Sequence, residues 1–306
     1  MRVLLDDISF KGRDAVIAAL DAHPSIEIRM FNPFVHRGAR GLVFVTDFRR
    51  VNHRMRNKLL VVDNALAMVG GRNIGNHYFG VDTGANYRDL DIAAGGPVVR
   101  EISSVFDHFF NGDWAVPISA LAGRPVLEKD LREARTILLE HIAADRYPYP
   151  IDQDVAELRS ELKAEIAKFV WAPGRIVWDD PAEIAATGGI SRMPEGLHRR
   201  LDTVESGLLI ESPYFVLRDR AIARMRELHD RGVRVRVLTN SLASNDVVAA
   251  HAGYADRRKQ VLESGVELYE LRADAGVIKK RIAYFGAKAA LHAKVVVFDR
   301  KDVFIV

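Results

Sequence analysis

Apolar and polar residues alternate in two stretches near the start of the chain, on either side of a segment with helical spacing. Residues 4–8 and 26–32 alternate, and residues 13–21 place apolar side chains at positions 16, 17 and 20. A period of two is typical of a half-buried strand, and a spacing of three to four is typical of an amphipathic helix. The order predicts a parallel βαβ unit with a right-handed crossover, in which the helix covers the sheet.

The same order recurs about two hundred residues later. Residues 208–211 and 233–240 predict strands, and residues 219–230 predict a helix with apolar side chains at 222, 225 and 228. Two such units indicate the internal duplication of an α/β domain.

The chain between the two copies has a different pattern. Residues 128–144 and 155–170 have helical periodicity, and a Pro- and Tyr-rich stretch at 146–150 separates them. Residues 173–194 are rich in Gly, Pro and Asp, which predicts a link dominated by loops. We expect a first half-domain with a helical insertion at 1–170, a linker at 171–204, and a second, C-terminally incomplete half-domain at 205–306.

Composition narrows the class of protein. The 306 residues carry 44 Lys and Arg against 41 Asp and Glu, and a net charge of +3 gives no broad basic field for nucleic acid. Cysteine is absent, which excludes disulfides, thiol catalysis and Cys-ligated metals. No apolar run approaches the ~18 residues that a membrane-spanning helix needs.

Strand patterns lie close to both ends of the chain. One begins at residue 2, and the apolar residues 302–306 end the chain without a polar tail. Because native termini usually fray in polar sequence, we expect the chain to be a fragment of a longer protein. No targeting signal is recognised, so the localisation of the fragment is not predicted.

A short charged motif follows the second copy. His292, Lys294 and Asp299 form the pattern H-x-K-x-x-x-x-D. Residues two apart on a strand lie on one face, so we expect His292 and Lys294 to point the same way. Residues 295–298 are apolar and are expected to enter the core, and Asp299 is expected to close the strand at a turn.

The first copy carries the same spacing, with Arg56 in the place of the histidine, followed by Lys58 and Asp63. One such motif occurs often by chance, whereas two motifs on duplicated βαβ units are a strong signal. If they form one site, we expect the basic side chains of both motifs to converge in a cleft between the half-domains.

This arrangement resembles the phospholipase D superfamily, whose members carry two H-x-K-x4-D motifs on two similar half-domains. Gly70-Gly71-Arg72-Asn73 matches the family's G-[SG]-x-N element, and residues 87–91 are similar to the segment in which an acidic residue orients a catalytic histidine. The resemblance implies an α/β fold of two similar half-domains with mixed sheets, flanked by helices and related by a pseudo-two-fold axis. Further likeness to bacterial cardiolipin synthase-like proteins lies in residues 70–76, 212–216 and 238–242.

The chemistry of a phosphodiester explains why these residue types recur. The phosphate repels a nucleophile, and negative charge moves to the leaving oxygen as the bond breaks. Lys58, Lys294 and the Asn73 amide are expected to donate hydrogen bonds to the phosphate oxygens. One neutral imidazole attacks phosphorus, while a second imidazolium protonates the leaving alcohol. Such a mechanism requires no metal and no other cofactor.

The resemblance also implies individual roles. The first-motif histidine is the nucleophile in the family, and His292 corresponds to the general acid that later acts as the base for water or an alcohol. By family position, Asp89 rather than Asp91 orients a histidine. We expect structural roles for Gly71 and for the two motif aspartates, Asp63 and Asp299.

Each candidate has a structural alternative. His292 fits an ordinary strand histidine, Asn73 fits a turn cap, and the two lysines fit residues that protect a sheet edge. His251 is a candidate for substrate binding because residues 245–254 are similar to a stretch in cardiolipin synthase-like proteins. A surface or core histidine is the alternative there.

The chain departs from the family at the nucleophile position. The Arg56 guanidinium stays protonated and has no lone pair to offer, so it can bind phosphate but cannot become a phosphohistidine. His53 is three residues away, which predicts the opposite face of the strand. The chain also ends before the second G-S-x-N element that the family carries.

The resemblance therefore implies an enzyme of phospholipid phosphodiester chemistry, a phosphatidyltransferase of the cardiolipin synthase type, with activity impaired or absent in this chain. A phospholipase D or nuclease-type phosphodiesterase is the alternative within the superfamily; the modest charge and the lack of interleaved aromatic and basic residues disfavour nucleic acid. An inactive phosphate- or lipid-binding protein is the third interpretation, and Arg56 favours it. The expected partners are an anionic phospholipid and, for the longer protein, a bacterial membrane surface.

Overall fold

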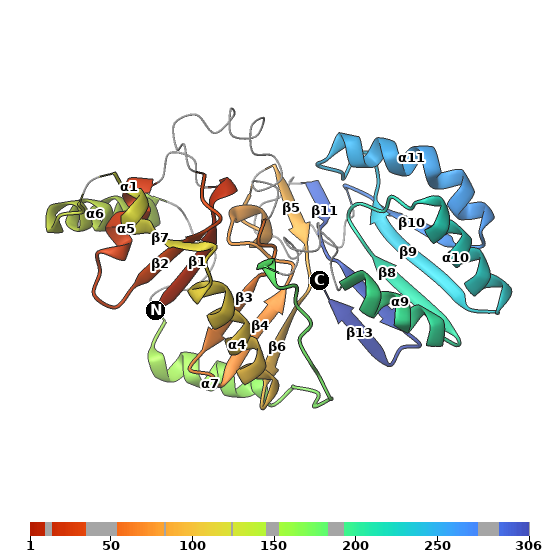
Figure 1. Ribbon diagram of the computed structural model, residues 1–306, viewed down its shortest axis with the longest axis horizontal. Coiled ribbons are helices and arrows are strands. Elements are labelled where there is room, and N and C mark those ends of the chain that lie inside the picture. The colour runs from red at the N-terminus through yellow and green to blue at the C-terminus, as the bar shows by residue number, and fades with distance from the viewer. Residues whose placement is uncertain are drawn as a thin grey trace. The chain divides into compact units, whose positions relative to one another are not determined.

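The computed structural model describes residues 1–9, 14–34, 54–82, 84–123, 125–144, 153–182, 193–274 and 288–305. Over these residues the chain is a mixed α/β protein, as the two βαβ patterns predict (Figure 1). It divides into two compact units, each built from two separate stretches of sequence. The first unit comprises Met1–Arg56 and Gly96–Ser191, and the second comprises Asn57–Gly95 and Arg192–Val306.

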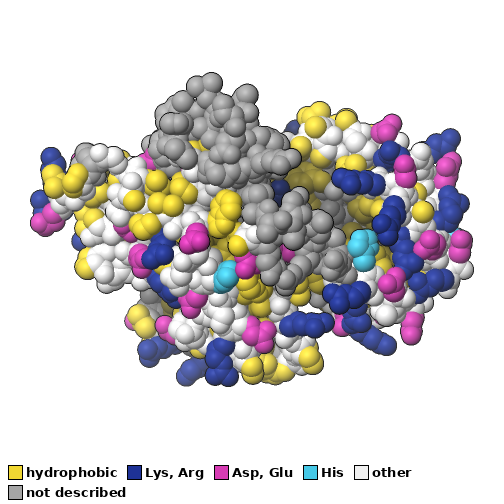
Figure 2. Space-filling view, in the orientation of Figure 1, with side chains coloured by type: hydrophobic (Ala, Val, Ile, Leu, Met, Phe, Trp, Pro, Cys, Tyr) yellow, Lys and Arg dark blue, Asp and Glu magenta, His cyan; other side chains and the backbone are white. Residues whose placement is uncertain are grey.

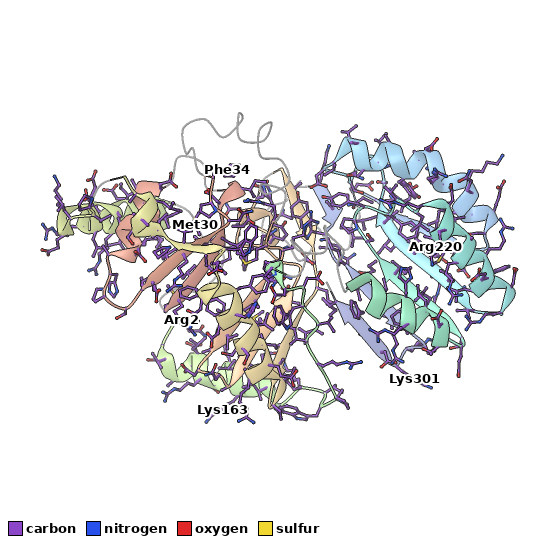
Figure 3. All side chains as sticks on the ribbon, in the orientation of Figure 1. Arg2, Met30, Phe34, Lys163, Arg220 and Lys301 are labelled. Carbon is purple, nitrogen blue, oxygen red and sulfur yellow. The ribbon has the colours of Figure 1, made fainter. Side chains whose placement is uncertain are left out.

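The first unit contains the first predicted βαβ motif. Strand β1 (Arg2–Asp6) pairs in parallel with β2 (Glu27–Phe31), α1 (Asp14–Asp21) connects them, and β7 (Ala115–Pro117) pairs antiparallel with β2. Met30 and Phe34 point into the interior of this unit (Figure 3) and are 0% and 1% exposed. Its further helices are η1 (Asp7–Ser9), α4 (Val98–Asn111), α5 (Ile118–Leu121), α6 (Glu128–Ala144) and α7 (Val155–Ile166).

The second predicted βαβ motif forms the main sheet of the second unit, in the strand order β10-β9-β8-β12-β13. The first three strands are parallel, and β12 and β13 continue the sheet antiparallel. Helices α9, α10 and α11 lie beside this sheet (Figure 1), and apolar side chains from all three join its core. The bounds are β8 (Gly207–Glu211), β9 (Arg234–Asn240), β10 (Glu267–Leu271), β12 (Val295–Phe298), β13 (Asp302–Ile305), α9 (Met193–Thr203), α10 (Asp219–Asp230) and α11 (Val248–Glu263).

Residues 57–95 also belong to the second unit, which differs from the division at 1–170, 171–204 and 205–306 that the sequence predicts. Strand β5 (Ala85–Arg88) pairs in parallel with β11 (Lys288–Leu291), and this pairing joins segments about two hundred residues apart. Nearby, β3, β4 and β6 form a small antiparallel sheet. Their bounds are Leu59–Val62, Leu66–Gly70 and Asp91–Gly95.

Both motif aspartates lie in matching turns. Asp63 and Asn64 have φ of 51° and 53°, and Asp299 and Arg300 have φ of 52° and 56°. In each turn the N–H three residues on donates to the carbonyl of the preceding strand, at 3.0 Å from Ala65 to Val62 and at 2.9 Å from Lys301 to Phe298. Two successive residues in the left-handed region are typical of the tight turns that join antiparallel strands, and Asp and Asn tolerate this region better than most residues.

The Asp299 carboxylate also holds the start of β8. It accepts hydrogen bonds from the Ser206 and Gly207 N–H groups at 2.7 and 3.1 Å, from Glu205 N–H, and from the Ser206 hydroxyl at 2.8 Å. These donors hold the pKa of Asp299 well below its usual range, the Ser206 N–H foremost.

We expect Asp299→Asn to lower the melting temperature at pH 7, because the amide loses the charge that these donors stabilise. A carboxyl whose pKa is lowered by folding stabilises the fold above its unfolded value of ~3.9, and this contribution is lost as the pH falls through the folded pKa. Melting curves of both proteins between pH 7 and pH 3 measure the difference, which should shrink on acidification. An equal difference at both pH values would contradict the assignment.

Charged side chains of both signs are mixed over the face of the second unit that Figure 2 shows. Arg224 pairs with Glu227 on α10 at 2.7 Å, and Arg258 of α11 pairs with Glu270 of β10 at 3.1 Å. Among the residues that the structure describes, none of the helices combines the length and the apolar character that crossing a membrane requires.

Candidate active site

His292 lies between two strands rather than within one. Strand β11 ends at Leu291 and β12 begins at Val295, so the prediction that His292 and Lys294 share a regular strand is wrong. Burial nevertheless alternates along residues 291–295 as it would in a strand. Leu291, Ala293 and Val295 are 3%, 3% and 6% exposed, while His292 and Lys294 between them are less buried. The Arg88 carbonyl accepts from the N–H groups of His292 at 2.8 Å and Ala293 at 3.1 Å, which fixes this segment to the end of β5.

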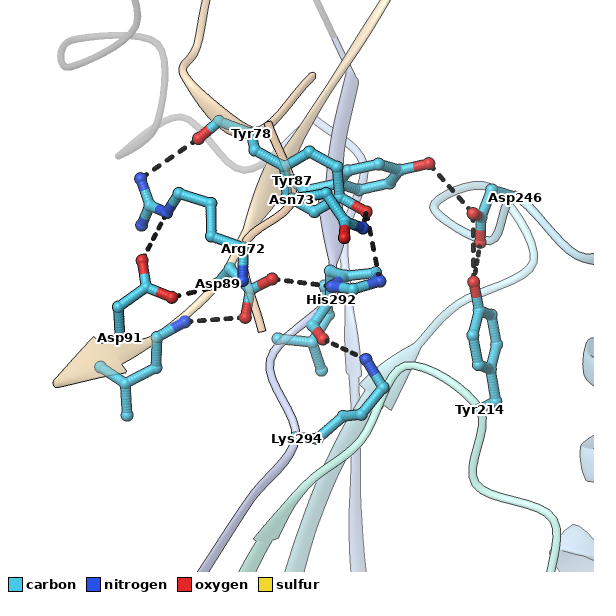
Figure 4. Close-up of polar contacts among 12 residues, drawn as sticks. Arg72, Asn73, Tyr78, Tyr87, Asp89, Asp91, Tyr214, Asp246, His292 and Lys294 are labelled. Atoms are coloured by element: carbon cyan, nitrogen blue, oxygen red, sulfur yellow. Dashed lines mark hydrogen bonds and ion pairs between the residues drawn. The ribbon is translucent and has the colours of Figure 1, made fainter. Parts of the chain in front are cut away.

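A buried carboxylate contacts the imidazole. Asp89 Oδ2 is 2.7 Å from His292 Nδ1, and the two side chains are 1% and 13% exposed (Figure 4). An ionised carboxylate only accepts hydrogen bonds, so it favours the tautomer with the proton on Nδ1 and leaves Nε2 for other partners. The structure thus brings together Asp89 and His292, which the family resemblance paired.

Asp91, the rejected alternative, has another partner. Its Oδ2 is 2.7 Å from Arg72 Nε, and its Oδ1 accepts from the Arg72 N–H at 3.2 Å. The two acidic residues of the segment 87–91 therefore have separate partners. Asp89 contacts His292 of the second motif, and Asp91 contacts Arg72.

The paired glycines make room for these carboxylates. A Cβ on Gly71 would lie 2.4 Å from Asp89 Oδ1, and a Cβ on Gly70 would lie 2.1 Å from Asp91 Oδ1. Real Cβ atoms do not approach other atoms this closely. The glycine requirement at Gly71 thus arises from the close approach of the Asp89 side chain rather than from an unusual φ.

Asn73 contacts a tyrosine that the sequence analysis did not single out. Its Nδ2 donates to Tyr78 Oη at 2.8 Å, and Tyr78 Oη lies 3.4 Å from His292 Nε2 (Figure 4). Tyr78 ends the short helix η2 (Asn76–Tyr78), and its ring meets the imidazole edge-on with centroids 5.1 Å apart. Burial raises the pKa of Tyr78, so the phenol stays protonated at neutral pH.

Two further tyrosines, Tyr87 and Tyr214, share one carboxylate, and the ring of Tyr87 lies beside the imidazole. Tyr87 donates to Asp246 Oδ2 at 3.0 Å, and Tyr214 donates to the same carboxylate at 2.8 Å. Burial and, after it, the hydrogen bond to Asp246 raise the pKa of Tyr87 to about 12 and shift that of Tyr214 upward as well. The Tyr87 ring lies 5.4 Å from that of His292. Tyr214 falls in a segment that carries the family likeness, but nothing in its pattern predicted a contact with residue 246.

Asn240 positions the backbone next to His292. Its side chain is buried and donates to the Leu291 carbonyl at 2.9 Å while accepting from the Leu291 N–H at 2.7 Å. Lys294 Nζ donates to the His292 carbonyl at 3.1 Å. Lys58 immediately precedes β3, where its carbonyl accepts from the Gly70 N–H at 3.3 Å.

Three candidates remain, His251, Arg56 and His53. His251 lies on α11, is 9% exposed, and has its ring 5.7 Å from that of Tyr254, and the described contacts do not connect it to His292. Arg56 is exposed and ends the first stretch of the first unit, so its convergence with the second motif stays a prediction. His53 lies outside the described residues.

An α/β unit with a carboxylate-held histidine, a lysine two residues later and a glycine-rich Asn73 element fits the phospholipase D-like class. Residues 197–306 match the family described as "Cardiolipin synthase, PLD-like domain". These residues therefore carry a PLD-like domain, as the second motif predicts.

Within this class the chain is similar to cardiolipin synthases. It is 36% identical to cardiolipin synthase C of Escherichia coli (strain K12) over 312 residues, and 29% identical to an uncharacterized protein of Helicobacter pylori (strain J99) over 311 residues. These alignments cover 100% and 98% of this chain but only 65% and 60% of the relatives. A solved structure of phosphatidylserine synthase from Haemophilus influenzae Rd KW20 has the same fold, with a TM-score of 0.52 at 14% identity over 97% of this chain and 70% of that one.

Proposed function

We propose that this chain carries the acid–base half of a phosphatidyltransferase of the cardiolipin synthase type. The observation that supports this proposal most is the hydrogen bond between Asp89 and His292. A carboxylate on Nδ1 stabilises the imidazolium and directs Nε2 toward a reacting group, which is what protonation of a leaving alcohol requires. The similarity to cardiolipin synthase C points to a phospholipid as the substrate.

In this proposal the donors of the site bind the phosphate. Lys58, Lys294 and the second N–H of the Asn73 amide stabilise the charge that develops on the phosphate oxygens. His292 gives its proton to the leaving alcohol and then takes a proton from the incoming one, while Asp89 holds the ring in place through both steps. An anionic phospholipid at a membrane surface is the proposed partner.

Arg56 limits what the chain does as it stands. It occupies the nucleophile position of the first motif and supplies positive charge without a lone pair. We therefore propose that this chain binds the headgroup of an anionic phospholipid. It converts the phospholipid to product only when an imidazole replaces the Arg56 guanidinium. An inactive phosphate- or lipid-binding protein is the second candidate function, and this residue is the observation that favours it.

The identity of the product tests the proposal. The Arg56→His chain, alone and extended through a second G-S-x-N element, is incubated with phosphatidylglycerol vesicles and, separately, with oligonucleotides, and the products are analysed by mass spectrometry. We expect cardiolipin and free glycerol in at least one of these forms. Phosphatidic acid alone would indicate a hydrolase. Cleavage confined to oligonucleotides would contradict the lipid assignment, and the absence of any product would leave the binding protein as the function.

A further inference from the structure

Tyr78 places a phenol oxygen next to the reactive nitrogen of His292. Its Oη is 3.4 Å from Nε2, and Asp89 already occupies Nδ1. Any proton that the imidazole exchanges with a substrate must therefore pass through Nε2, at the position where the Tyr78 hydroxyl lies. The mechanism described above uses no group at this position.

The hydroxyl has the right number of hydrogen-bonding sites to stand between the imidazole and a substrate. A phenol carries one proton and two lone pairs. The Asn73 amide donates into one lone pair at 2.8 Å. The remaining lone pair and the proton can then serve Nε2 and one further oxygen atom, in either order.

The position of Tyr78 is held from several sides. Its carbonyl accepts from Arg72 Nη1 at 3.2 Å, and Arg72 is in turn ion-paired with Asp91. The ring meets His292 edge-on and lies 4.9 Å from the ring of Tyr87. The hydroxyl is thus directed by packing and not by the Asn73 contact alone.

We propose that Tyr78 is a catalytic residue that relays the proton between His292 and the alcohol oxygen of the substrate. In the first step the imidazolium Nε2–H proton moves to Oη, and the tyrosine's own proton moves to the leaving alkoxide as its bond to phosphorus breaks. In the second step the incoming alcohol or water gives its proton to Oη while Oη gives its own to Nε2. The phenol ends each step with one proton, and the upward shift of its pKa keeps the free phenolate rare. This inference rests on the proposed function.

Substrates with different leaving groups distinguish a proton relay by Tyr78 from a role of Tyr78 in packing alone. p-Nitrophenolate leaves phosphorus without needing a proton, whereas an alkoxide needs one. Tyr78→Phe keeps the ring but removes the hydroxyl, and it is introduced into the form of the Arg56→His chain that converts phosphatidylglycerol to product. We expect it to lower phosphatidylglycerol turnover by about a hundredfold, the lower range of general acid–base effects.

With a p-nitrophenyl phosphodiester, the same variant should keep the rapid first release of p-nitrophenolate and lose the later turnover. The reason is that only the second step then needs the relay, and the covalent intermediate should accumulate. Tyr269→Phe is the matched control, since Tyr269 is exposed and its hydroxyl donates to the Glu267 side chain on the same strand. An equal loss in both phases would assign Tyr78 to packing, and no loss in either phase would exclude the relay.

A readout without turnover tests the contact itself. In the 306-residue chain with Arg56 in place, the ¹⁵N resonance of His292 Nε2 should move on Tyr78→Phe and stay in place on Tyr269→Phe. An unmoved resonance would overturn the relay even if the proposed function holds. If no form of the Arg56→His chain turns over any substrate, the proposed function fails, and the relay fails with it.

Discussion

Arg56→His is expected to create turnover where the chain with Arg56 shows none. A guanidinium cannot attack phosphorus, and the loss of the nucleophile in a comparable covalent enzyme costs on the order of a millionfold in rate. The variant should therefore form an alkali-stable phosphoryl adduct on residue 56 when it is incubated with phosphatidylglycerol or a chromogenic phosphodiester. Peptide mass spectrometry after alkaline quenching locates the adduct.

Two further variants make this result specific. Arg56→Gln removes the same charge without supplying an imidazole, and it should stay inactive. His292→Ala in the Arg56→His chain should abolish phosphatidylglycerol turnover, because the leaving alcohol then lacks its proton donor. If the chain is already active with Arg56, the nucleophile assignment is wrong, and His292 or His53 becomes the residue on which to trap the adduct.

Asp89→Asn in the Arg56→His chain is expected to lower turnover by about 10²- to 10⁴-fold, the range of general acid–base contributions. The amide occupies nearly the same volume, but it can donate its N–H to Nδ1 and so favour the wrong tautomer. It also lacks the charge that stabilises the imidazolium. Steady-state rates with phosphatidylglycerol, measured across pH 5 to 9, would show the loss.

Asp63→Asn is the matched control for this change. It makes the same chemical substitution in the first motif, at a turn position with φ of 51° that asparagine tolerates. We expect its turnover to stay within a few fold of the parent chain. If both variants lose activity to the same extent, the contact between Asp89 and His292 has no special role in catalysis.

The sequence by itself determined the local structure of this protein. Both βαβ units, the helices that begin at Glu128 and Val155, and the turns at Asp63 and Asp299 follow from periodicity and turn chemistry over a few residues. The two H-x-K-type motifs and the Gly70-Gly71 pair were likewise visible as short patterns. Local signals suffice there because the period of a strand or helix and the residues of a tight turn are set by a few successive positions.

The prediction from sequence was wrong where the alternation of buried and exposed side chains was taken to indicate a hydrogen-bonded strand. Residues 292–294 continue the alternation of the strand before them, yet the N–H groups of His292 and Ala293 both donate to the Arg88 carbonyl instead of forming a regular ladder. Periodicity reports which side chains are buried, and it does not report which backbone partners a segment finds.

Only the tertiary structure decided the composition of the site. The contacts of His292 with Asp89 and Tyr78 span 203 and 214 residues, and that of Tyr87 with Asp246 spans 159. They depend on the pairing of β5 with β11, which carries residues 57–95 into the second unit. No local propensity encodes such a pairing, because its stability comes from hydrogen bonds and packing between segments that are distant in the chain.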